Sequence, residues 1–324
     1  MSALGQGEDS YVAVVDVGGT TLKGALADRD GALFLRDRRQ TSPDRGPQAV
    51  LEGILGLVDD LVAEGVRRHG ARALAGIGIA VPGPVDERAG IVLDAPNLGW
   101  RDVPLRQMAV ERTGMQVFIT HDVRAAASGD AALGSGRTAA DHLFIAIGTG
   151  VGAAVVIDGR PYSGMHSTAG EMGHMTIDPD GPLCGCGVRG HLEAYAAAGG
   201  MQKLYAEATG EQIDAEVLVG RAVAGDEPAR RIWHQAIDAL ALSIANVVVI
   251  LDPQRVVIGG GLAAAGEYLF QPLRERIRER LPFGRAPEIL PAELGAEAGM
   301  RGMAVLTWRG IAQSASSPGR PAAD

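Results

Sequence analysis

The chain has 324 residues, of which 46% are hydrophobic and 21% are charged. This length suits one large α/β domain or two lobes, and this composition excludes an intrinsically disordered chain. The net charge of −9 disfavours a nucleic-acid partner, because binding a phosphate backbone requires clustered Lys and Arg.

The longest apolar run covers residues 239–251 and contains Ser243 and Asn246. It is shorter than the ~20 residues that span a bilayer, so it predicts a buried helix. Residues 1–10 are polar and lack the apolar core of a secretory signal. We therefore expect a cytoplasmic protein without a membrane partner.

The first predicted elements are two strands joined by a glycine turn. An apolar run over 11–17 leads into the sequence DVGGT at 16–20, and alternating residues continue to Ala27. Apolar residues at helical spacing predict a helix over 48–69, and a strand over 74–81 follows.

The next segment predicts a helix over 105–112 and a strand over 116–120. Asp122 follows this strand directly and can cap the Ala-rich helix after it. The sequence therefore places an acidic side chain at a strand-to-helix corner.

A second series repeats the first unit. A strand over 143–147 leads into the glycine turn GTGVG at 148–152, and a strand over 153–157 returns. Further on, a long helix is capped at Asp226 and runs to about Ile250. Two related α/β halves that face each other across a cleft suit this order.

The glycine turns are candidate phosphate sites. Without Cβ atoms their backbone N–H groups can approach phosphate oxygens, and Thr20 and Thr149 add hydroxyl donors. Two ordinary hairpins are the alternative. The chain has no P-loop motif, and the second turn leads into a strand, which argues against a dinucleotide fold. Gly259–Gly261 joins a strand over 255–258 to a helix, a geometry that suits a nucleoside or a plain turn.

The chain's two cysteines, Cys184 and Cys186, are too close in sequence for an ordinary disulfide. With His174 and His191 they supply four N/S ligands, the set of a closed, structural zinc site. Glu171 and Glu193 bracket these residues, and a metal would fix both carboxylates. The alternatives for the two glutamates are helix capping and solvent exposure.

These motifs, in this order over nearly the whole chain, resemble the ROK family of sugar kinases and sugar-responsive repressors, and among them most closely the bacterial glucokinases. The most specific is the Cys-x-Cys-Gly-x-x-Gly element. The residues that carry the resemblance are the two glycine turns, 82–86 (PGPVD), 96–100 (PNLGW), Asp122, Glu171-x-x-His174, 184–190 (CGCGVRG) with Glu193, and Gly259–Gly261.

The resemblance implies a two-lobed α/β protein with the actin-like ATPase (ribonuclease H-like) fold, an active-site cleft and a structural zinc site. The small lobe would comprise residues 1–122 and a C-terminal helix at about 302–313. The large lobe would comprise 123–301, including the zinc motif. Residues 314–324, rich in Ser, Pro and Ala, would form a frayed tail.

The resemblance further implies an ATP-dependent hexose kinase, with glucose to glucose 6-phosphate as the default reaction and Asp122 as the catalytic base. The implied sugar ligands are Gly83, Asn97, His121, Asp122, Glu171, His174 and Glu193. The implied ATP site comprises Asp16, which would face Mg²⁺, Gly18, Gly19, Thr20, Thr149, Gly150, Gly260 and Gly261. The implied Zn²⁺ ligands are His174, Cys184, Cys186 and His191. A homodimer or homotetramer is expected.

Three residues depart from the family pattern. His191 stands where a third cysteine is usual, and imidazole is an acceptable zinc ligand. His121 and Arg124 stand where asparagines are usual, next to the expected base. If Arg124 faces the cleft it could pair with Asp122 and lower the pKa of that carboxyl. Otherwise we expect it to point to solvent or to another chain.

His121 leaves the preferred sugar open among glucose, mannose, fructose, an amino sugar, an N-acylhexosamine and a cyclitol. A sugar-responsive repressor is a second hypothesis. Only fifteen residues precede Asp16, which leaves no room here for a DNA-binding domain. A non-catalytic sugar-binding protein is a third hypothesis, which the presence of Asp122 and both glycine turns disfavours.

Overall fold

The computed structural model describes residues 10–70, 73–282 and 285–316. Contacts within the chain divide it into two compact units. Unit 1 comprises Met1–Ala132, Ser163–Thr168 and Ala296–Asp324, and unit 2 comprises Leu133–Tyr162 and Ala169–Gly295. Each unit is built on a five-stranded sheet.

The sheet of unit 1 has the strand order β3-β2-β1-β4-β8. Strands β1, β2 and β3 form an antiparallel meander, whereas β4 and β8 run parallel to β1. The bounds are β1 (Tyr11–Val17), β2 (Thr21–Ala27), β3 (Leu33–Gln40), β4 (Leu74–Val81) and β8 (Val117–His121).

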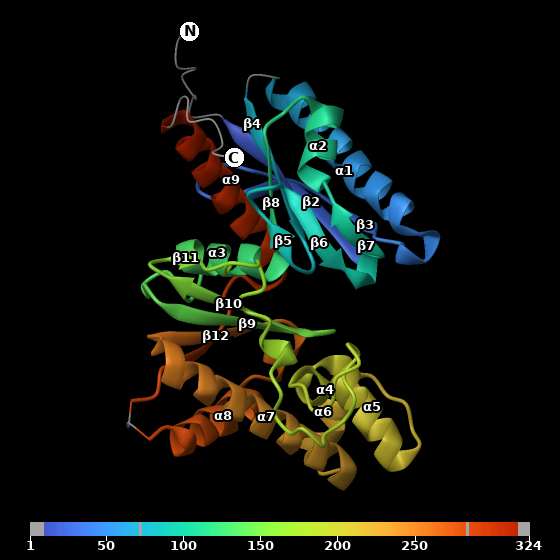
Figure 1. The fold of residues 1–324 in the computed structure, drawn as a ribbon, viewed down its shortest axis with the longest axis vertical. Coiled ribbons are helices and arrows are strands. Elements are labelled where there is room, and N and C mark those ends of the chain that lie inside the picture. Colours follow the sequence, from blue (N-terminus) through green and yellow to red (C-terminus); the bar gives the residue numbers. More distant parts are fainter. Residues whose placement is uncertain (1–9, 71–72, 283–284, 317–324) are drawn as a thin grey trace. The chain divides into compact units, whose positions relative to one another are not determined.

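Helices cover both faces of this sheet (Figure 1), because the side chains of β1 alternate between two apolar clusters. Tyr11, Ala13 and Val15 pack with α1 (Pro47–His69) and α2 (Leu105–Thr113). Val12 and Val14 pack with α9 (Ala298–Ser316). Both faces of the central strand β1 are therefore buried.

Helix α3 (Asp122–Leu133) meets α9 at a close backbone contact. A Cβ atom on Gly302 would lie 1.6 Å from the carbonyl oxygen of Ala125, and one on Gly129 would lie 2.9 Å from that of Ala298. This contact explains why nearly all of α3 belongs to unit 1. The boundary between the units thus falls at the end of α3, whereas the sequence places it at Asp122.

The rest of unit 1 is a small antiparallel sheet with short helical turns. It comprises β5 (Val85–Asp86), β6 (Ile91–Ala95), β7 (Trp100–Val103), and the 3₁₀ turns η1 (Pro43–Arg45) and η2 (Pro96–Leu98).

The sheet of unit 2 has the strand order β11-β10-β9-β12-β13, with two antiparallel and two parallel pairings in the same places as in unit 1. The predicted repeat of a strand, a glycine turn and a strand is thereby confirmed. The strands are β9 (His142–Ile147), β10 (Val151–Ile157), β11 (Arg160–Pro161), β12 (Arg255–Gly259) and β13 (Glu288–Pro291). The helices and turns are η3 (Met172–His174), α4 (Glu193–Ala196), α5 (Ala198–Thr209), α6 (Ala215–Val223), α7 (Glu227–Leu251), η4 (Gly261–Ala265) and α8 (Glu267–Arg280). The 3₁₀ turn η5 (Gly295–Glu297) follows, with Gly295 in unit 2 and the other two residues in unit 1.

Helix α7 is the core helix of unit 2. The side chain of Asp226 accepts a hydrogen bond from the Ala229 N–H at 2.9 Å, as the predicted cap requires. Trp233 and Leu240 belong to the same buried cluster as residues of the sheet, and α7 lies beside α8 (Figure 1). Among the described helices α7 alone is long and apolar enough to cross a membrane, and half of its apolar window is buried inside the protein.

The C-terminal helix is longer than expected. It begins at Ala298 and ends at Ser316, so residues 314–316 of the expected frayed tail form its last turn. Residues 317–324 lie outside the described residues.

The α3–α9 contact makes a stability prediction. Gly302→Ala should lower the free energy of unfolding by about 1–3 kcal/mol, because the added methyl group has no space beside Ala125. Chemical denaturation measures this. The matched control is Gly56→Ala in α1, where a Cβ meets no atom within 4 Å. That variant should be neutral or more stable, and equal losses in both variants would contradict the close contact.

Candidate active site

In unit 1 four candidate residues lie at one edge of the sheet. Because β1, β4 and β8 are parallel, their carboxyl ends lie together, and Asp16 pairs with Ala80 while Val81 pairs with His121. The turn with Gly83 and the start of α3 at Asp122 follow directly. Ligands of open α/β sheets bind outside such carboxyl ends.

The first glycine turn is held by backbone bonds. The Gly18 N–H donates to the Thr21 carbonyl at 2.9 Å, and the Thr41 hydroxyl donates to the Gly18 carbonyl at 2.7 Å. Gly19 is partly buried and Thr20 is exposed at the tip of the turn. The turn therefore has a fixed backbone and an accessible hydroxyl.

Asp16 is a largely buried carboxylate at the base of this turn. Burial raises its pKa, and the Lys23 ammonium, 3.4 Å from Oδ2, opposes the rise. A Cβ on Gly299 of α9 would come within 2.8 Å of the carboxyl group. A carboxyl group in this setting gains from any further cation that approaches it.

Asp122 is the first residue of α3, where its negative charge suits the helix N-terminus. Oδ1 accepts a hydrogen bond from the Val123 N–H at 2.7 Å and lies 3.1 Å from Nε2 of His121. Burial, and then the charge of Arg124, lower the pKa of His121 to about 3. The imidazole beside Asp122 is therefore neutral.

Both expectations for Arg124 are wrong. The side chain is only 2% exposed and pairs with Glu87, whose Oε1 lies 3.0 Å from its Nε. The guanidinium also donates to the carbonyls of Val85 at 3.2 Å and Ser167 at 3.1 Å. This network could not be predicted from the sequence, because Glu87 lies 37 positions away from Arg124. The ion pair forms only in the folded chain.

The remaining candidates of unit 1 lie in its small sheet. Gly83 has a φ of 84°, and a Cβ there would lie 2.0 Å from the Asp94 carbonyl oxygen, so the position requires glycine. Asn97 is exposed on η2. The adjacent Trp100 is buried, and its ring N–H donates to the Pro47 carbonyl at 3.1 Å.

In unit 2 the other two glycine turns meet at the edge where β9 and β12 end. These strands are parallel, and a Cβ on Gly260 would lie 2.2 Å from the Ile147 carbonyl oxygen. A cavity of about 390 Å³ opens at this edge. It is lined by Ile147, Gly148, Ala198, Ala215, Glu216, Val219, Gly261, Leu262, Ala264 and Ala265. Of the residues that line this cavity, sequence analysis indicated only the glycines, because the lining residues on the helices belong to no recognisable motif.

Glu193 supports the second glycine turn. Its Oε2 accepts a hydrogen bond from the Val151 N–H at 3.1 Å, and a Cβ on Gly150 would lie 2.6 Å from that oxygen. Thr149 is exposed and lines a separate cavity of about 480 Å³ together with Glu193. Neither helix capping nor solvent exposure describes this carboxylate.

Glu171 and His174 are held against β10 by two glycines. Cβ atoms on Gly170 and Gly173 would each lie 2.2 Å from a carbonyl oxygen of β10. The Gly170 carbonyl accepts from the Ala153 N–H at 3.0 Å. Glu171 immediately precedes the single turn η3, whose last residue is His174.

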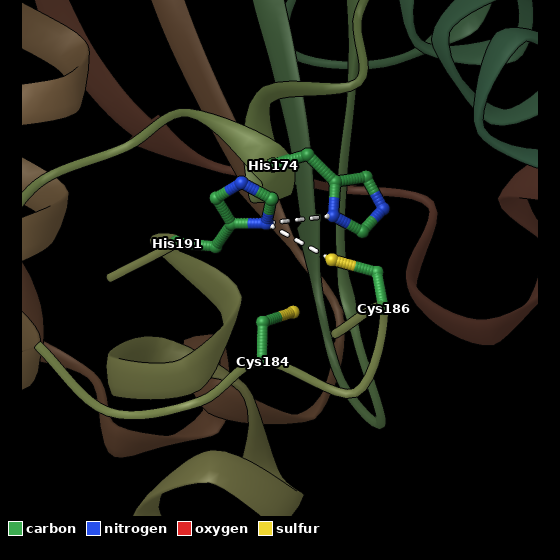
Figure 2. Close-up of side chains that lie close together, drawn as sticks. All are labelled: His174, Cys184, Cys186 and His191. Atoms are coloured by element: carbon green, nitrogen blue, oxygen red, sulfur yellow. Dashed lines mark hydrogen bonds between the residues drawn. The ribbon is translucent and has the colours of Figure 1, made fainter. Parts of the chain in front are cut away.

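The four predicted metal ligands converge (Figure 2). The nearest ligand atoms of His174, Cys184, Cys186 and His191 all lie within 4.8 Å of one another. Nδ1 of His191 lies 3.3 Å from Nδ1 of His174 and 3.2 Å from Sγ of Cys186. These side chains come from η3, the 184–190 turn and His191, two residues before α4.

Two of the ligand-atom distances, 3.3 and 3.2 Å, are close to those of a tetrahedral zinc ion, and the four atoms as a set lie within 4.8 Å. Zn–N bonds of ~2.0 Å and Zn–S bonds of ~2.3 Å place ligand atoms about 3.3–3.8 Å apart. Burial raises the pKa of the Cys184 thiol, so a divalent cation would be needed to hold it as a thiolate. The turn is glycine-dependent, since a Cβ on Gly190 would lie 1.5 Å from the Asp178 carbonyl oxygen.

Known proteins that are similar to this chain show its fold class and its family. The doubled five-stranded sheet and its structural neighbours are those of the actin-like ATPase fold, as the sequence predicts. The ROK family model matches residues 12–309, and the chain belongs to this family.

A glucokinase from Thermotoga maritima is 34% identical over 308 residues, which cover 90% of this chain and 95% of that protein. A ROK hexokinase from Thermus thermophilus has a TM-score of 0.82 and 33% identity, covering 94% of this chain and 99% of the other. A ROK family glucokinase from Streptomyces griseus in complex with glucose and AMPPNP has a TM-score of 0.80 and 28% identity, covering 93% and 100%.

The Arg124 network makes a second stability prediction. Arg124→Leu should lower the free energy of unfolding by about 2–4 kcal/mol, because buried carbonyls lose their donor. The matched control is Arg112→Leu, which removes a half-exposed ion pair with Asp59 and should cost less than about 1 kcal/mol. Urea unfolding of both variants measures the difference, and equal losses would show that the burial of Arg124 is energetically unimportant.

Proposed function

We propose that this chain is an ATP-dependent kinase that transfers the γ-phosphoryl group to a hydroxyl of a hexose, with glucose as the default substrate. The observation that carries this proposal is the similarity to a glucokinase whose structure holds glucose and AMPPNP. The glucokinase relative at 34% identity supports the same reaction.

Each unit carries residues that we propose bind the nucleotide. The cavity at Gly260 and Gly261 takes the adenosine, since it combines apolar side chains with the carboxylate of Glu216. Gly18, Gly19, Thr20, Thr149 and Gly150 bind phosphates through N–H and hydroxyl groups. Mg²⁺ arrives with ATP and neutralises phosphate charge when bound. The largely buried carboxylate of Asp16 would face this Mg²⁺.

Asp122 is the base in this proposal. It accepts the proton of the attacking sugar hydroxyl while the oxygen–phosphorus bond forms and the bond to ADP breaks. Its fixed contacts with Val123 and His121 support the role, because phosphoryl transfer depends mainly on alignment. The proposed sugar ligands are Gly83, Asn97 and His121 of unit 1 and Glu171, His174 and Glu193 of unit 2.

The metal cluster is structural in this proposal. Zinc held by His174, Cys184, Cys186 and His191 would fix the loop that carries Glu171 and the turn that leads to Glu193. Because Glu193 also binds the Val151 N–H, ordering this cluster supports the second phosphate turn.

A kinase for another hexose derivative is the second candidate. His121 favours it, because a neutral imidazole presents different hydrogen-bonding groups from the amide usual at this position. We also propose a cytoplasmic location, where ATP and sugar are available, and a homodimer or homotetramer. Light scattering coupled to gel filtration tests the last point.

ADP release with Mg-ATP across hexoses, hexosamines, N-acetylhexosamines and cyclitols tests the reaction. We expect turnover on glucose, and turnover on a relative of glucose alone would select the second candidate.

Asp122→Asn should lower kcat by about 10²–10⁴-fold, because the amide cannot accept the proton. Full turnover in that variant would remove Asp122 from the mechanism, and silence of the native protein on the whole panel would overturn the proposed function.

Metal analysis tests the cluster. Purified protein should hold about one zinc per chain, and Cys186→Ser should lose zinc and lower Tm. The matched control is Val188→Ser, an exposed position of the same turn that contributes no ligand side chain. It should keep its zinc. A folded, active protein without zinc would contradict the assignment.

A further inference from the structure

The cavity at the edge where β9 and β12 end lies entirely within unit 2, and one charged side chain lines it. Of the ten described residues on its wall, nine are glycine or carry aliphatic side chains, and the tenth is Glu216. Small-molecule sites are typically concave and mostly apolar, with a few polar groups that fix the orientation of the ligand. In this cavity of about 390 Å³, Glu216 is the side chain that can do so.

Two glycines on the cavity wall leave space that the protein itself does not fill. A Cβ on Gly148 or on Gly261 would meet no atom within 4 Å, and neither residue has a positive φ. Gly260 differs, because its φ is 84° and a Cβ there would lie 2.2 Å from the Ile147 carbonyl oxygen. Gly260 therefore shapes the turn, whereas Gly148 and Gly261 leave room for a ligand beside the backbone.

The carboxylate of Glu216 is not engaged by the rest of the protein. Glu216 is exposed on the first turn of α6, and within residues 10–70, 73–282 and 285–316 it has no hydrogen-bond or ion-pair partner. The nearby Glu211, by contrast, is paired with Arg221. A negative charge on the first turn stabilises a helix, which accounts for an acidic residue at this position but not for its place on the wall of an apolar cavity.

We propose that Glu216 selects the nucleoside of the phosphoryl donor by accepting hydrogen bonds from it. An ionised carboxylate accepts hydrogen bonds and cannot donate them, so the groups it recognises are donors. Adenosine offers two kinds of donor, the ribose hydroxyls and the amino group of the base. This inference rests on the proposed function, in which the cavity takes adenosine, and it adds which side chain recognises the nucleoside.

The sign of the effect separates this role from that of a solvated charge. A carboxylate repels the phosphates of a nucleotide, so a Glu216 that only faced solvent would weaken nucleotide binding, and its neutralisation would strengthen binding. A hydrogen bond to a charged acceptor acts in the opposite direction and is stronger than one between neutral groups. Neutralising Glu216 should therefore weaken binding if it holds the nucleoside.

Calorimetric titration of the full chain with Mg-ADP measures this effect without turnover. Glu216→Gln should raise the Kd for Mg-ADP by about 5–10-fold, because a neutral amide replaces the charged acceptor. The matched control is Glu279→Gln, which neutralises an exposed carboxylate of α8 that does not line the cavity. Its Kd should stay within about twofold of the native value, since salt screens distant surface charges.

Two analogues identify the donor group. 2′-Deoxy-ADP lacks a ribose hydroxyl, and purine riboside 5′-diphosphate lacks the amino group. The native protein should bind one of them about 5–10-fold more weakly than ADP, and Glu216→Gln should bind that analogue and ADP within about twofold of each other. Inorganic tripolyphosphate has no nucleoside, so its Kd should differ by less than about twofold between the native protein and Glu216→Gln.

A second variant tests the cavity itself. Gly261→Val adds a side chain where a Cβ meets no atom within 4 Å, so the protein should stay folded by circular dichroism. Its Kd for Mg-ADP should rise more than about tenfold, because the side chain occupies space that the nucleoside needs. Unchanged Mg-ADP binding by folded Gly261→Val would show that the nucleoside binds elsewhere.

Three results would overturn the role of Glu216. They are unchanged or tighter Mg-ADP binding by Glu216→Gln, an equal loss in Glu279→Gln or with tripolyphosphate, and native binding of both analogues as tight as that of ADP. If the native protein phosphorylates a sugar but gives one of these results, only this inference fails. If Mg-ADP binding behaves as expected but no sugar is phosphorylated, only the proposed function fails. A native protein that does not bind Mg-ADP contradicts both.

Discussion

The parallel pairing at the centre of each sheet is the constraint on which the candidate site depends. In unit 1 it brings the ends of β1, β4 and β8 to one edge, and in unit 2 it does the same for β9 and β12. Every glycine turn singled out from the sequence follows or connects these strands. The backbone hydrogen bonds of these strands thus place Asp16, Asp122 and Gly260 at the sheet edges.

Close backbone approaches then fix the loops around those edges. Gly83, Gly170, Gly173 and Gly260 each lie where a Cβ would come within about 2.2 Å of a carbonyl oxygen. Glycine is required there because no side chain fits, and at Gly83, Gly170 and Gly260 also because φ is positive. This gives a physical reason for the abundance of glycine in a chain that otherwise has an ordinary composition.

Two side-chain clusters complete the arrangement, one in each unit. In unit 1 a buried guanidinium, Arg124, joins the loop of Glu87 to the carbonyl of Ser167. Burial, and then the charge of Arg124, lower the pKa of His121. In unit 2 the Cys/His cluster lies beside Glu193, whose carboxylate binds the second glycine turn. Each cluster thus connects residues with proposed roles in sugar binding to the backbone of neighbouring loops.

Local sequence patterns predicted many of the helices, strands and site residues. Apolar periodicity predicted β1, α1, β4 and α7, since core burial imposes the same spacing on any chain. Asp226 marked the start of α7, because a cap acts over three residues. The repeat of a strand, a glycine turn and a strand predicted the doubled sheet, and four N/S ligand side chains within eighteen positions predicted the metal cluster.

The remaining features of the site depend on contacts between residues that are far apart in the sequence, and only the tertiary structure shows them. The chain order shows that Arg124 follows Asp122, yet its partner Glu87 and the carbonyl of Ser167 come from distant loops. The close contact of α3 with α9 joins Gly129 to Gly302, so it, rather than local sequence, decided to which unit α3 belongs. The sequence thus determined the elements, the motifs and the family, because these depend on neighbouring residues. The charge state of His121 and the surroundings of the proposed base depend on burial, which exists only once the chain has folded.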